Sequence, residues 1–422
     1  MLLGWIGVVV NYGFRLVFLH LIVAALHLVW HALCRAFGAL PRNIRCLLLT
    51  GFIRFIRWHV DNFWTWVQWK LWLPWPHARA QDQQQVMKGV DSIRWDKYGG
   101  HHQELVHVIT PDKEHAAKLS SMPPRKARTV VYFHGGGFVF ASSSVLIHSV
   151  TCFARQGFTV YSFDYPLAPE KRFPGSLIST LRALHWLRAR EGIAVVMLLG
   201  DSAGANLVSM AAAMVMNRPL LEQFAAAAEA PELLAWTFPR IECMSCLYGL
   251  LDQHSWRGRS LKQISQLENF MAEGGISGAL ELYESLEGVF DNRLSLMDIA
   301  EDIEHFPRCL FVGGSQDPLI YSTLIAHERL YARGFDVHCK IYPARHGYFG
   351  FPPQWTFGAW KTGAAPTCEL LADFFSQTPA THRRLCSNMR DGTSCCLAHK
   401  GDYGVHALRA YDRHFSETGE GW

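Results

Sequence analysis

Charged residues are scarce in this chain, and those present form no long run. They make up 18% of the 422 residues, with a formal net charge of +4 at pH 7. No basic stretch interleaved with aromatic residues is found, which excludes a dedicated nucleic-acid-binding protein. Half of the residues are hydrophobic, which excludes a disordered chain and indicates one large globular domain with extensions.

The sequence also lacks the paired spacings of a metal site. Cys243 and Cys246 have CxxC spacing, but they lie in an apolar run that predicts a buried strand, and no second pair accompanies them. Cys386, Cys395 and Cys396 near the C-terminus lack the ligand spacing of a zinc site. We therefore expect no metal and no other cofactor. The odd total of eleven cysteines argues against a tight disulfide framework but leaves one or two bridges open.

Formal charge is absent altogether from residues 16–34. A helix of this length spans about 28 Å, close to the hydrocarbon thickness of a bilayer. Arg15 is the single charged residue before it, so the basic segment that precedes the apolar core of a cleaved signal peptide is missing. We expect an uncleaved membrane anchor.

Residues 46–75 mix charged side chains with many aromatic ones, including Trp58, Trp64, Trp66, Trp69, Trp72 and Trp75. Tryptophan favours the interface between lipid and water. The segment therefore predicts a second helix that lies on the membrane surface or re-enters it, with packing on the enzyme's own surface as the alternative. Arginines between residues 35 and 57 place that side of the first span in the cytoplasm by the positive-inside rule, unless the second segment also crosses.

From about residue 91, short apolar runs alternate with helical patterns. Strands are predicted near 130–133, 158–163, 194–199, 243–250, 308–313 and 337–342, with helices near 177–187 and 203–216. This alternation is typical of an α/β fold whose mainly parallel sheet carries helices on both faces. Reactive groups in such a fold lie on loops at the carboxyl ends of the strands.

The candidate nucleophile is Ser202, in the run Gly200-Asp201-Ser202-Ala203-Gly204. A Gly-x-Ser-x-Gly run is common by chance, but this one joins a predicted buried strand to an alanine-rich helix, the setting in which the serine is lifted above the sheet. The two glycines allow the sharp turn. An N-capping serine in an ordinary turn is the alternative.

A glycine loop, His134-Gly-Gly-Gly-Phe138, follows the first of these strands. Glycines let backbone amides approach a substrate oxygen, so we expect an oxyanion hole formed by Gly135 and Gly136 together with Ala203. A phosphate-binding loop is disfavoured because no Lys-Ser/Thr pair follows. We expect His134 to shape the loop through a structural hydrogen bond.

The general base is expected late in the chain, and His346 follows the last predicted strand. Asp317 follows the preceding strand and is the candidate acid. Asp336 is a rival, although it comes before a strand. The order Ser202, Asp317, His346 is the one that α/β-hydrolases require. His346 would accept the serine proton, while Asp317 would orient and stabilise the imidazolium.

Over residues 91–376 these motifs, with the run Asp164-Tyr-Pro-Leu-Ala-Pro-Glu170, resemble the hormone-sensitive lipase group of α/β-hydrolases, which includes arylacetamide deacetylases and neutral cholesteryl ester hydrolases. The resemblance implies an α/β-hydrolase domain, which we place over 81–379, between a membrane-anchoring region (1–80) and a tail (380–422). Residues 253–300 depart from the pattern of the group and are a candidate lid element, as is the segment 81–127. It implies a structural role for the Asp164–Glu170 run. Pro166 replaces an arginine usual in the group, which puts that arginine's contacts in doubt.

We therefore predict a serine hydrolase of the endoplasmic reticulum membrane that cleaves esters of lipophilic substrates through an acyl-enzyme on Ser202. Its partners would be the ester or lipid substrate and the membrane. Amide or acetyl-ester deacetylation with the same triad is one alternative. A non-catalytic ligand receptor on the same fold is another.

Overall fold

The computed structural model describes residues 44, 46–54, 87–120, 127–144, 147–256, 276–349 and 365–376. The expected membrane anchor at 16–34, the tryptophans at 58–75 and the tail at 380–422 lie outside these residues. Among the residues that are described, no helix is both long enough and apolar enough to cross a membrane.

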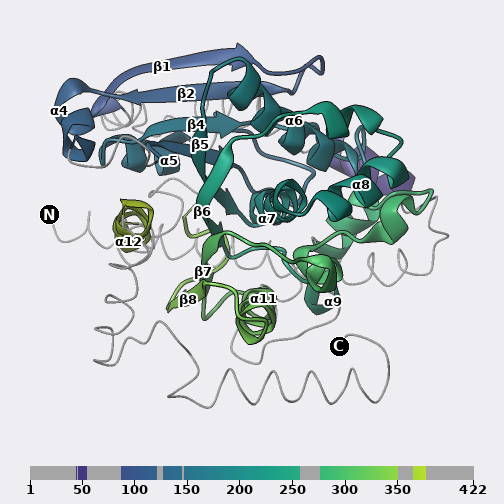
Figure 1. Cartoon of the computed structure of the whole chain (residues 1–422). Coiled ribbons are helices and arrows are strands. Elements are labelled where there is room, and N and C mark those ends of the chain that lie inside the picture. The colour runs from purple at the N-terminus through teal and green to yellow at the C-terminus, as the bar shows by residue number, and fades with distance from the viewer. Residues whose placement is uncertain are drawn as a thin grey trace, which may run out of the picture.

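A single eight-stranded sheet runs through the described domain in the order β1-β2-β4-β3-β5-β6-β7-β8 (Figure 1). From β4 to β8 all neighbouring strands are parallel, whereas β1 and β2 are antiparallel additions at one edge. This confirms the predicted α/β fold with a mostly parallel sheet. The strands are β1 (Val90–Lys97), β2 (Leu105–Pro111), β3 (Thr129–Phe133), β4 (Thr159–Phe163), β5 (Val195–Asp201), β6 (Arg240–Leu247), β7 (Arg308–Gly314) and β8 (Val337–Tyr342).

The edge strands correct one expectation. Residues 90–111 fall in a segment assigned to a possible lid, but they form β1 and β2 of the sheet instead. Most β1 side chains are at least partly exposed, because the strand has a partner on one side only. The sequence of β1 therefore lacks the apolar alternation by which a strand is usually recognised.

Helices cover both faces of the sheet (Figure 1). Strand side chains alternate between the two faces, so Val131 and Phe133 join one apolar core while Val130 and Tyr132 join the other. The first core is covered by α6 (Gly175–Ala189), α7 (Ala203–Met216), α8 (Arg218–Ala227) and α11 (Ile320–Ala332), and the second by α5 (Ile147–Ala154) and α12 (Ala365–Ser376). Shorter helical turns are α4 (Lys113–Ala116), α9 (Gln253–Trp256), η1 (Ala117–Leu119), η2 (Pro231–Ala235), η3 (Val289–Asn292), η4 (Leu296–Asp298) and η5 (Ala300–Asp302).

Cysteines serve the core in two ways. Cys243 and Cys246 are both fully buried in β6, and their spacing of three places them in opposite cores, so they cannot hold one metal ion together. Cys152 of α5 and Cys368 of α12 form a disulfide between positions 216 residues apart. The bridge ties the C-terminal helix to the middle of the domain.

A helical segment at residues 46–54 packs on residues 276–299, which we call the cap segment. The Cys46 thiol lies 3.8 Å from the carbonyl oxygen of Glu281, and Leu49 and Ile53 pack against the first core. The opposite side of the helix is apolar yet exposed, with Leu47 71% and Leu48 50% accessible. Packing on the enzyme's own surface, one of the two interpretations of this segment, thus applies to one face of the helix.

Candidate active site

Ser202 sits on a strained turn between β5 and α7. Its backbone angles, φ 51° and ψ −116°, are ones that non-glycine residues rarely adopt. The turn is held by the Ser202 amide, which donates to the carbonyl oxygen of Leu247 at 2.8 Å. Side chains on the flanking glycines would collide with backbone: a methyl group on Gly200 would meet the Gly204 carbonyl, and one on Gly204 the Phe133 carbonyl. The pentapeptide is therefore required for the close approach of β5, β3 and α7.

The structure brings the three predicted catalytic residues together. The hydroxyl of Ser202 lies 3.0 Å from Nε2 of His346, and Nδ1 of His346 lies 2.9 Å from Oδ2 of Asp317. The other oxygen of Asp317 accepts the amide of Leu319 at 2.7 Å. Asp336, the rival acid, lies at the opposite end of β8 and pairs with His338.

The loops that carry Asp317 and His346 are joined backbone to backbone. The amide of Ser315 donates to the Tyr342 carbonyl at 2.8 Å, and that of Gln316 to the Ala344 carbonyl at 3.0 Å. Gly314 permits this contact, because a methyl group there would overlap the Ala344 carbonyl oxygen. The separation of acid and base is thus set by main-chain geometry at the carboxyl ends of β7 and β8.

His346 is tuned as a base by opposing influences. Burial is the largest single effect and lowers its pKa, while the charge and hydrogen bond of Asp317 and the charge of Asp201 raise it; the net pKa lies above the ordinary value for histidine. About a third of the side chain is accessible, so solvent and substrate can reach the imidazole. Asp317 is fully buried. A raised pKa suits a group that must accept a proton from serine and hold it.

The oxyanion loop differs from the prediction in one residue. The amide of Gly135 donates to Oδ1 of Asp201 at 2.7 Å, so it cannot serve a substrate oxygen. Gly136 and Gly137 adopt φ angles of 113° and 60°, and within the described part of the chain their amides have no acceptor. The loop amides left to serve a substrate oxygen are therefore those of Gly136 and Gly137, together with the amide of Ala203 at the start of α7.

Asp201 is the anchor of this loop and was missed at the sequence level. Besides Gly135, its Oδ1 accepts the hydroxyl of Tyr132 at 2.6 Å. Burial raises the pKa of Asp201, although the hydrogen bonds of Tyr132 and Gly135 oppose the shift. A sequence signal that could have pointed to Asp201 is its place immediately before Ser202 in the Gly-x-Ser-x-Gly run.

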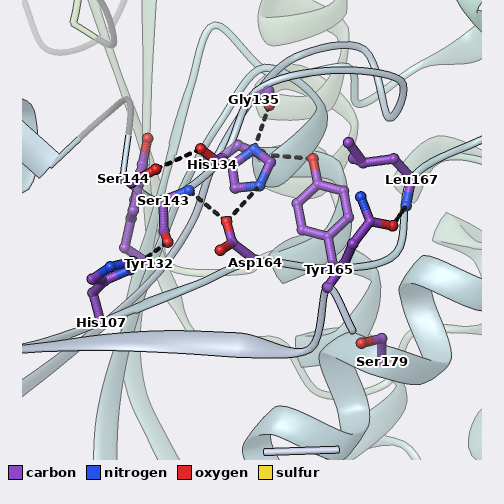
Figure 2. Close-up of polar contacts among 12 residues, drawn as sticks. His107, Tyr132, His134, Gly135, Ser143, Ser144, Asp164, Tyr165, Leu167 and Ser179 are labelled. Atoms are coloured by element: carbon purple, nitrogen blue, oxygen red, sulfur yellow. Dashed lines mark hydrogen bonds and ion pairs between the residues drawn. The ribbon is translucent and has the colours of Figure 1, made fainter. Parts of the chain in front are cut away.

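His134 supports the loop from below, as Figure 2 shows. Its Nδ1 lies 2.7 Å from the Gly135 carbonyl oxygen, and its ring stacks on that of Tyr165. The Tyr165 hydroxyl donates to the His134 carbonyl at 2.8 Å, while Asp164 lies 3.4 Å from Nε2 of His134 and accepts the Ser143 amide. His134 and the Asp164–Glu170 run thus shape the loop without reaching the nucleophile.

The cap segment lies against the same loop. The ring of Tyr283 stacks on that of Phe138 with 3.8 Å between the ring centroids. A methyl group built on Gly137 would come within 3.3 Å of the Ala279 side chain. The cap segment, which falls within the candidate lid region at 253–300, therefore packs on the glycine loop.

The described residues contain no cluster of three or more histidine, cysteine, aspartate or glutamate side chains that could hold a metal ion. The site consists of a nucleophile, a base, an acid and amide donors. These groups carry out acyl transfer. The fold and this site define a serine hydrolase.

Comparison with known proteins agrees with this class. Residues 130–350, more than half of the chain, match the family described by the alpha/beta hydrolase fold, and the chain belongs to that family. An acetyl esterase of Salmonella typhi is 24% identical over 249 residues, which cover 56% of this chain and 69% of the relative. An acetyl esterase of Salmonella dublin matches with the same identity and coverage.

Solved structures show the same fold at low identity. Carboxyl esterase 2 of the fungus Tuber melanosporum superposes with a TM-score of 0.54 at 18% identity, over 68% of this chain and 86% of its own. The esterase of Pyrobaculum calidifontis gives a TM-score of 0.51 at 19% identity, over 71% and 92% of the two chains. These structures show the fold alone. The catalytic triad, the family match and the acetyl esterase relatives together confirm the predicted class of enzyme, an esterase of the α/β-hydrolase family.

Proposed function

We propose that this esterase cleaves carboxylic esters of lipophilic substrates at a membrane, through an acyl-enzyme on Ser202. The observation that carries the chemical part is the continuous chain of contacts from Ser202 through His346 to Asp317. The amides of Gly136 and Gly137, which have no acceptor within the described residues, supply donors from the glycine loop. Nothing in this arrangement requires a cofactor.

The reaction follows from these contacts. Nε2 of His346 accepts the hydroxyl proton as Oγ of Ser202 attacks the ester carbonyl carbon, and the carbonyl oxygen gains negative charge beside the amides of Gly136, Gly137 and Ala203. His346 then returns the proton to the departing alcohol, and the acyl group remains on Ser202. A water molecule then attacks the acyl carbon while His346 accepts its proton, and His346 returns that proton to Ser202 as the acid leaves. Asp317 stabilises the imidazolium in both halves of the reaction.

Support for a membrane location comes from the helix at 46–54. Its exposed face presents Leu47, Leu48 and Phe52 to solvent, although a soluble surface rarely gathers apolar side chains in this way. The same helix lies between the uncharged stretch at 16–34 and the tryptophan-rich stretch ending at Trp75. Both neighbours favour lipid.

We further propose the endoplasmic reticulum membrane with the catalytic domain on its lumenal side. The Cys152–Cys368 disulfide supports this side, because such bonds persist in oxidising compartments and are rare in the cytosol. The arginines after the first span argue for the opposite side, and a second crossing by the aromatic segment would reconcile the two.

The acyl group is proposed to be short, since the curated relatives are acetyl esterases. The lipophilic part would then be the alcohol. The resemblance to the hormone-sensitive lipase group supports the same substrate class.

The decisive experiment is turnover of a panel of esters and matched amides by the full chain, with Ser202→Ala as control. We expect hydrolysis of acetyl esters of lipophilic alcohols, and a loss of several orders of magnitude in Ser202→Ala. Faster cleavage of the matched amides would instead establish a deacetylase. Absence of turnover together with absence of fluorophosphonate labelling would establish a non-catalytic receptor.

The membrane part is tested separately with Leu47→Glu, and with Tyr331→Glu, an exposed residue of α11, as the matched control. Leu47→Glu should lower kcat/KM several-fold for an ester held in phosphatidylcholine vesicles and leave a water-soluble ester unaffected. Equal rates for Leu47→Glu and Tyr331→Glu on the vesicle-held ester would refute a lipid contact at this face.

A further inference from the structure

Tyr248 lies at the junction of the catalytic elements. It is the first residue after β6, it is completely buried, and its φ of 38° is one that side-chain-bearing residues rarely adopt. Its amide donates to the Val312 carbonyl of β7 at 2.6 Å. Backbone strain at a bulky residue persists only where its surroundings enforce it, and it is concentrated at functional sites.

The ring of Tyr248 contacts the catalytic base. It meets the imidazole of His346 edge to face, with 5.0 Å between the centroids and 70° between the planes. The same ring packs on Tyr348, two residues beyond the base, at 5.2 Å. An aromatic ring in this position limits rotation of the imidazole and can attract it when it becomes a cation.

The hydroxyl of Tyr248 faces the other half of the site. It lies 3.3 Å from Oδ2 of Asp201, whose other oxygen holds the amide of Gly135. One side chain therefore touches both the base and the carboxylate that anchors the oxyanion loop. The 3.3 Å contact is long for a hydrogen bond between oxygens. We therefore expect the ring of Tyr248 to contribute more than its hydroxyl to the arrangement of the site.

We propose that Tyr248 is a positioning residue of the esterase reaction, whose ring holds His346 between Ser202 and Asp317. The proposal rests on the serine hydrolase mechanism given above. Tyr248 exchanges no proton with the substrate; the proton still passes from Ser202 to His346 and then to the leaving alcohol. The strained backbone is what directs the ring at the imidazole, because a residue in ordinary extended conformation would continue β6.

The alternative role for Tyr248 is filling of the core, and three variants separate the two. Tyr248→Phe retains the ring and removes the hydroxyl. Tyr248→Leu removes the ring. Phe224→Leu makes a comparable cavity at a fully buried aromatic residue of α8 that packs on Phe173 and Phe290, away from the triad.

We expect Tyr248→Leu to lower kcat by about 10²-fold with little change in KM, since misplacement of a catalytic group by about 1 Å has an effect of this order. Tyr248→Phe should keep kcat within about 10-fold of the wild-type value, because one ordinary hydrogen bond contributes about that factor. Phe224→Leu should leave kcat unchanged at a temperature where all variants are folded by circular dichroism.

The second-order rate of fluorophosphonate reaction with Ser202 is measured alongside, because it reports on the activated serine without any assumption about the natural ester. If the wild type reacts with the probe but cleaves no ester, the substrate proposal fails while the Tyr248 comparison still stands. The Tyr248 proposal is overturned if Tyr248→Leu and Phe224→Leu behave alike in both assays. It is also overturned if Tyr248→Phe loses as much as Tyr248→Leu.

Discussion

Removal of the Cys152–Cys368 bridge should strongly destabilise the fold while leaving the catalytic residues intact. The bonded positions are 216 residues apart. In the chain-entropy description, a disulfide that closes a loop of this length stabilises the folded state by about 5 kcal/mol, because it restricts the unfolded chain. Measured values for disulfides are typically about 2–4 kcal/mol. Folded domains have a total stability of about 5–15 kcal/mol, so the bridge accounts for a large part of it.

The location of the bridge links stability to catalysis. It joins α5 to α12, and both helices hold the loop after His346: the Ser149 hydroxyl donates to the Phe349 carbonyl at 2.6 Å, and Tyr348 contacts Thr367. Aromatic packing of Phe153 on Phe375 remains when the bridge is removed. We therefore expect the Cys152→Ser/Cys368→Ser variant to keep near-normal kcat at 25 °C and to lose activity at a lower temperature than the wild type.

Thermal unfolding of the wild type with and without reductant, beside the double-serine variant, measures the effect. For a domain of this size, loss of the stability contributed by the bridge corresponds to a melting temperature lower by about 10 °C. Reductant should lower the wild-type value to that of the variant and leave the variant unchanged, which separates this bridge from any other cysteine. Peptide mapping that finds Cys152 and Cys368 as free thiols after expression in an oxidising compartment would refute the argument, as would identical melting of all samples.

Three further predictions concern the site and the turn that carries Ser202. Asp317→Asn should lower kcat by about 10⁴-fold, as expected when a triad histidine loses its orienting carboxylate. Activity requires neutral His346, so kcat/KM of the wild type should fall as the pH drops through the pKa of His346, which lies above the ordinary histidine value. In Asp317→Asn this fall should occur at lower pH, because the charge and the hydrogen bond of Asp317 no longer raise the pKa of His346. Gly204→Ala should abolish activity or folding by overlap with the backbone at the end of β3, whereas Gly100→Ala, at a glycine with open space around it, should be neutral; an active, stable Gly204→Ala enzyme would contradict the packing at the turn.

The triad could be predicted because each of its residues follows a strand that can be recognised from the neighbouring sequence. Ser202 and Asp317 each follow an apolar run that forms a buried parallel strand, and His346 follows β8, a partly buried parallel strand at the edge of the sheet. Parallel strands bring their carboxyl ends to one edge of the sheet. The register agrees with this: Leu247 lies opposite both Asp201 and Val312, so β5 and β6 end at the same level and β7 ends two residues further on. Asp317 could be preferred over Asp336 on this ground alone.

What could not be predicted depends on the direction of backbone bonds and on contacts between distant residues. The glycines of the loop look equivalent in sequence, yet the amide of Gly135 donates to Asp201, whereas the amides of Gly136 and Gly137 have no acceptor within the described residues. The pairing of Cys152 with Cys368 has no local signature. The same is true of Tyr248, whose strained φ only tertiary packing could enforce.

The position of the cap segment connects the proposed membrane location to the chemistry. Leu49 of the helix at 46–54 lies against Gly278, and the next residue, Ala279, lies against the glycine loop. The helix at 46–54 is thus separated from the glycine loop by the cap residues Gly278 and Ala279. If lipid contacts the exposed face, then an ester leaving the bilayer meets the cap segment first and the oxyanion loop immediately behind it. A substrate with a lipophilic alcohol would then keep that portion near the cap while its acyl carbon reaches Ser202, in agreement with the short acyl group and lipophilic alcohol that we propose from the acetyl esterase relatives.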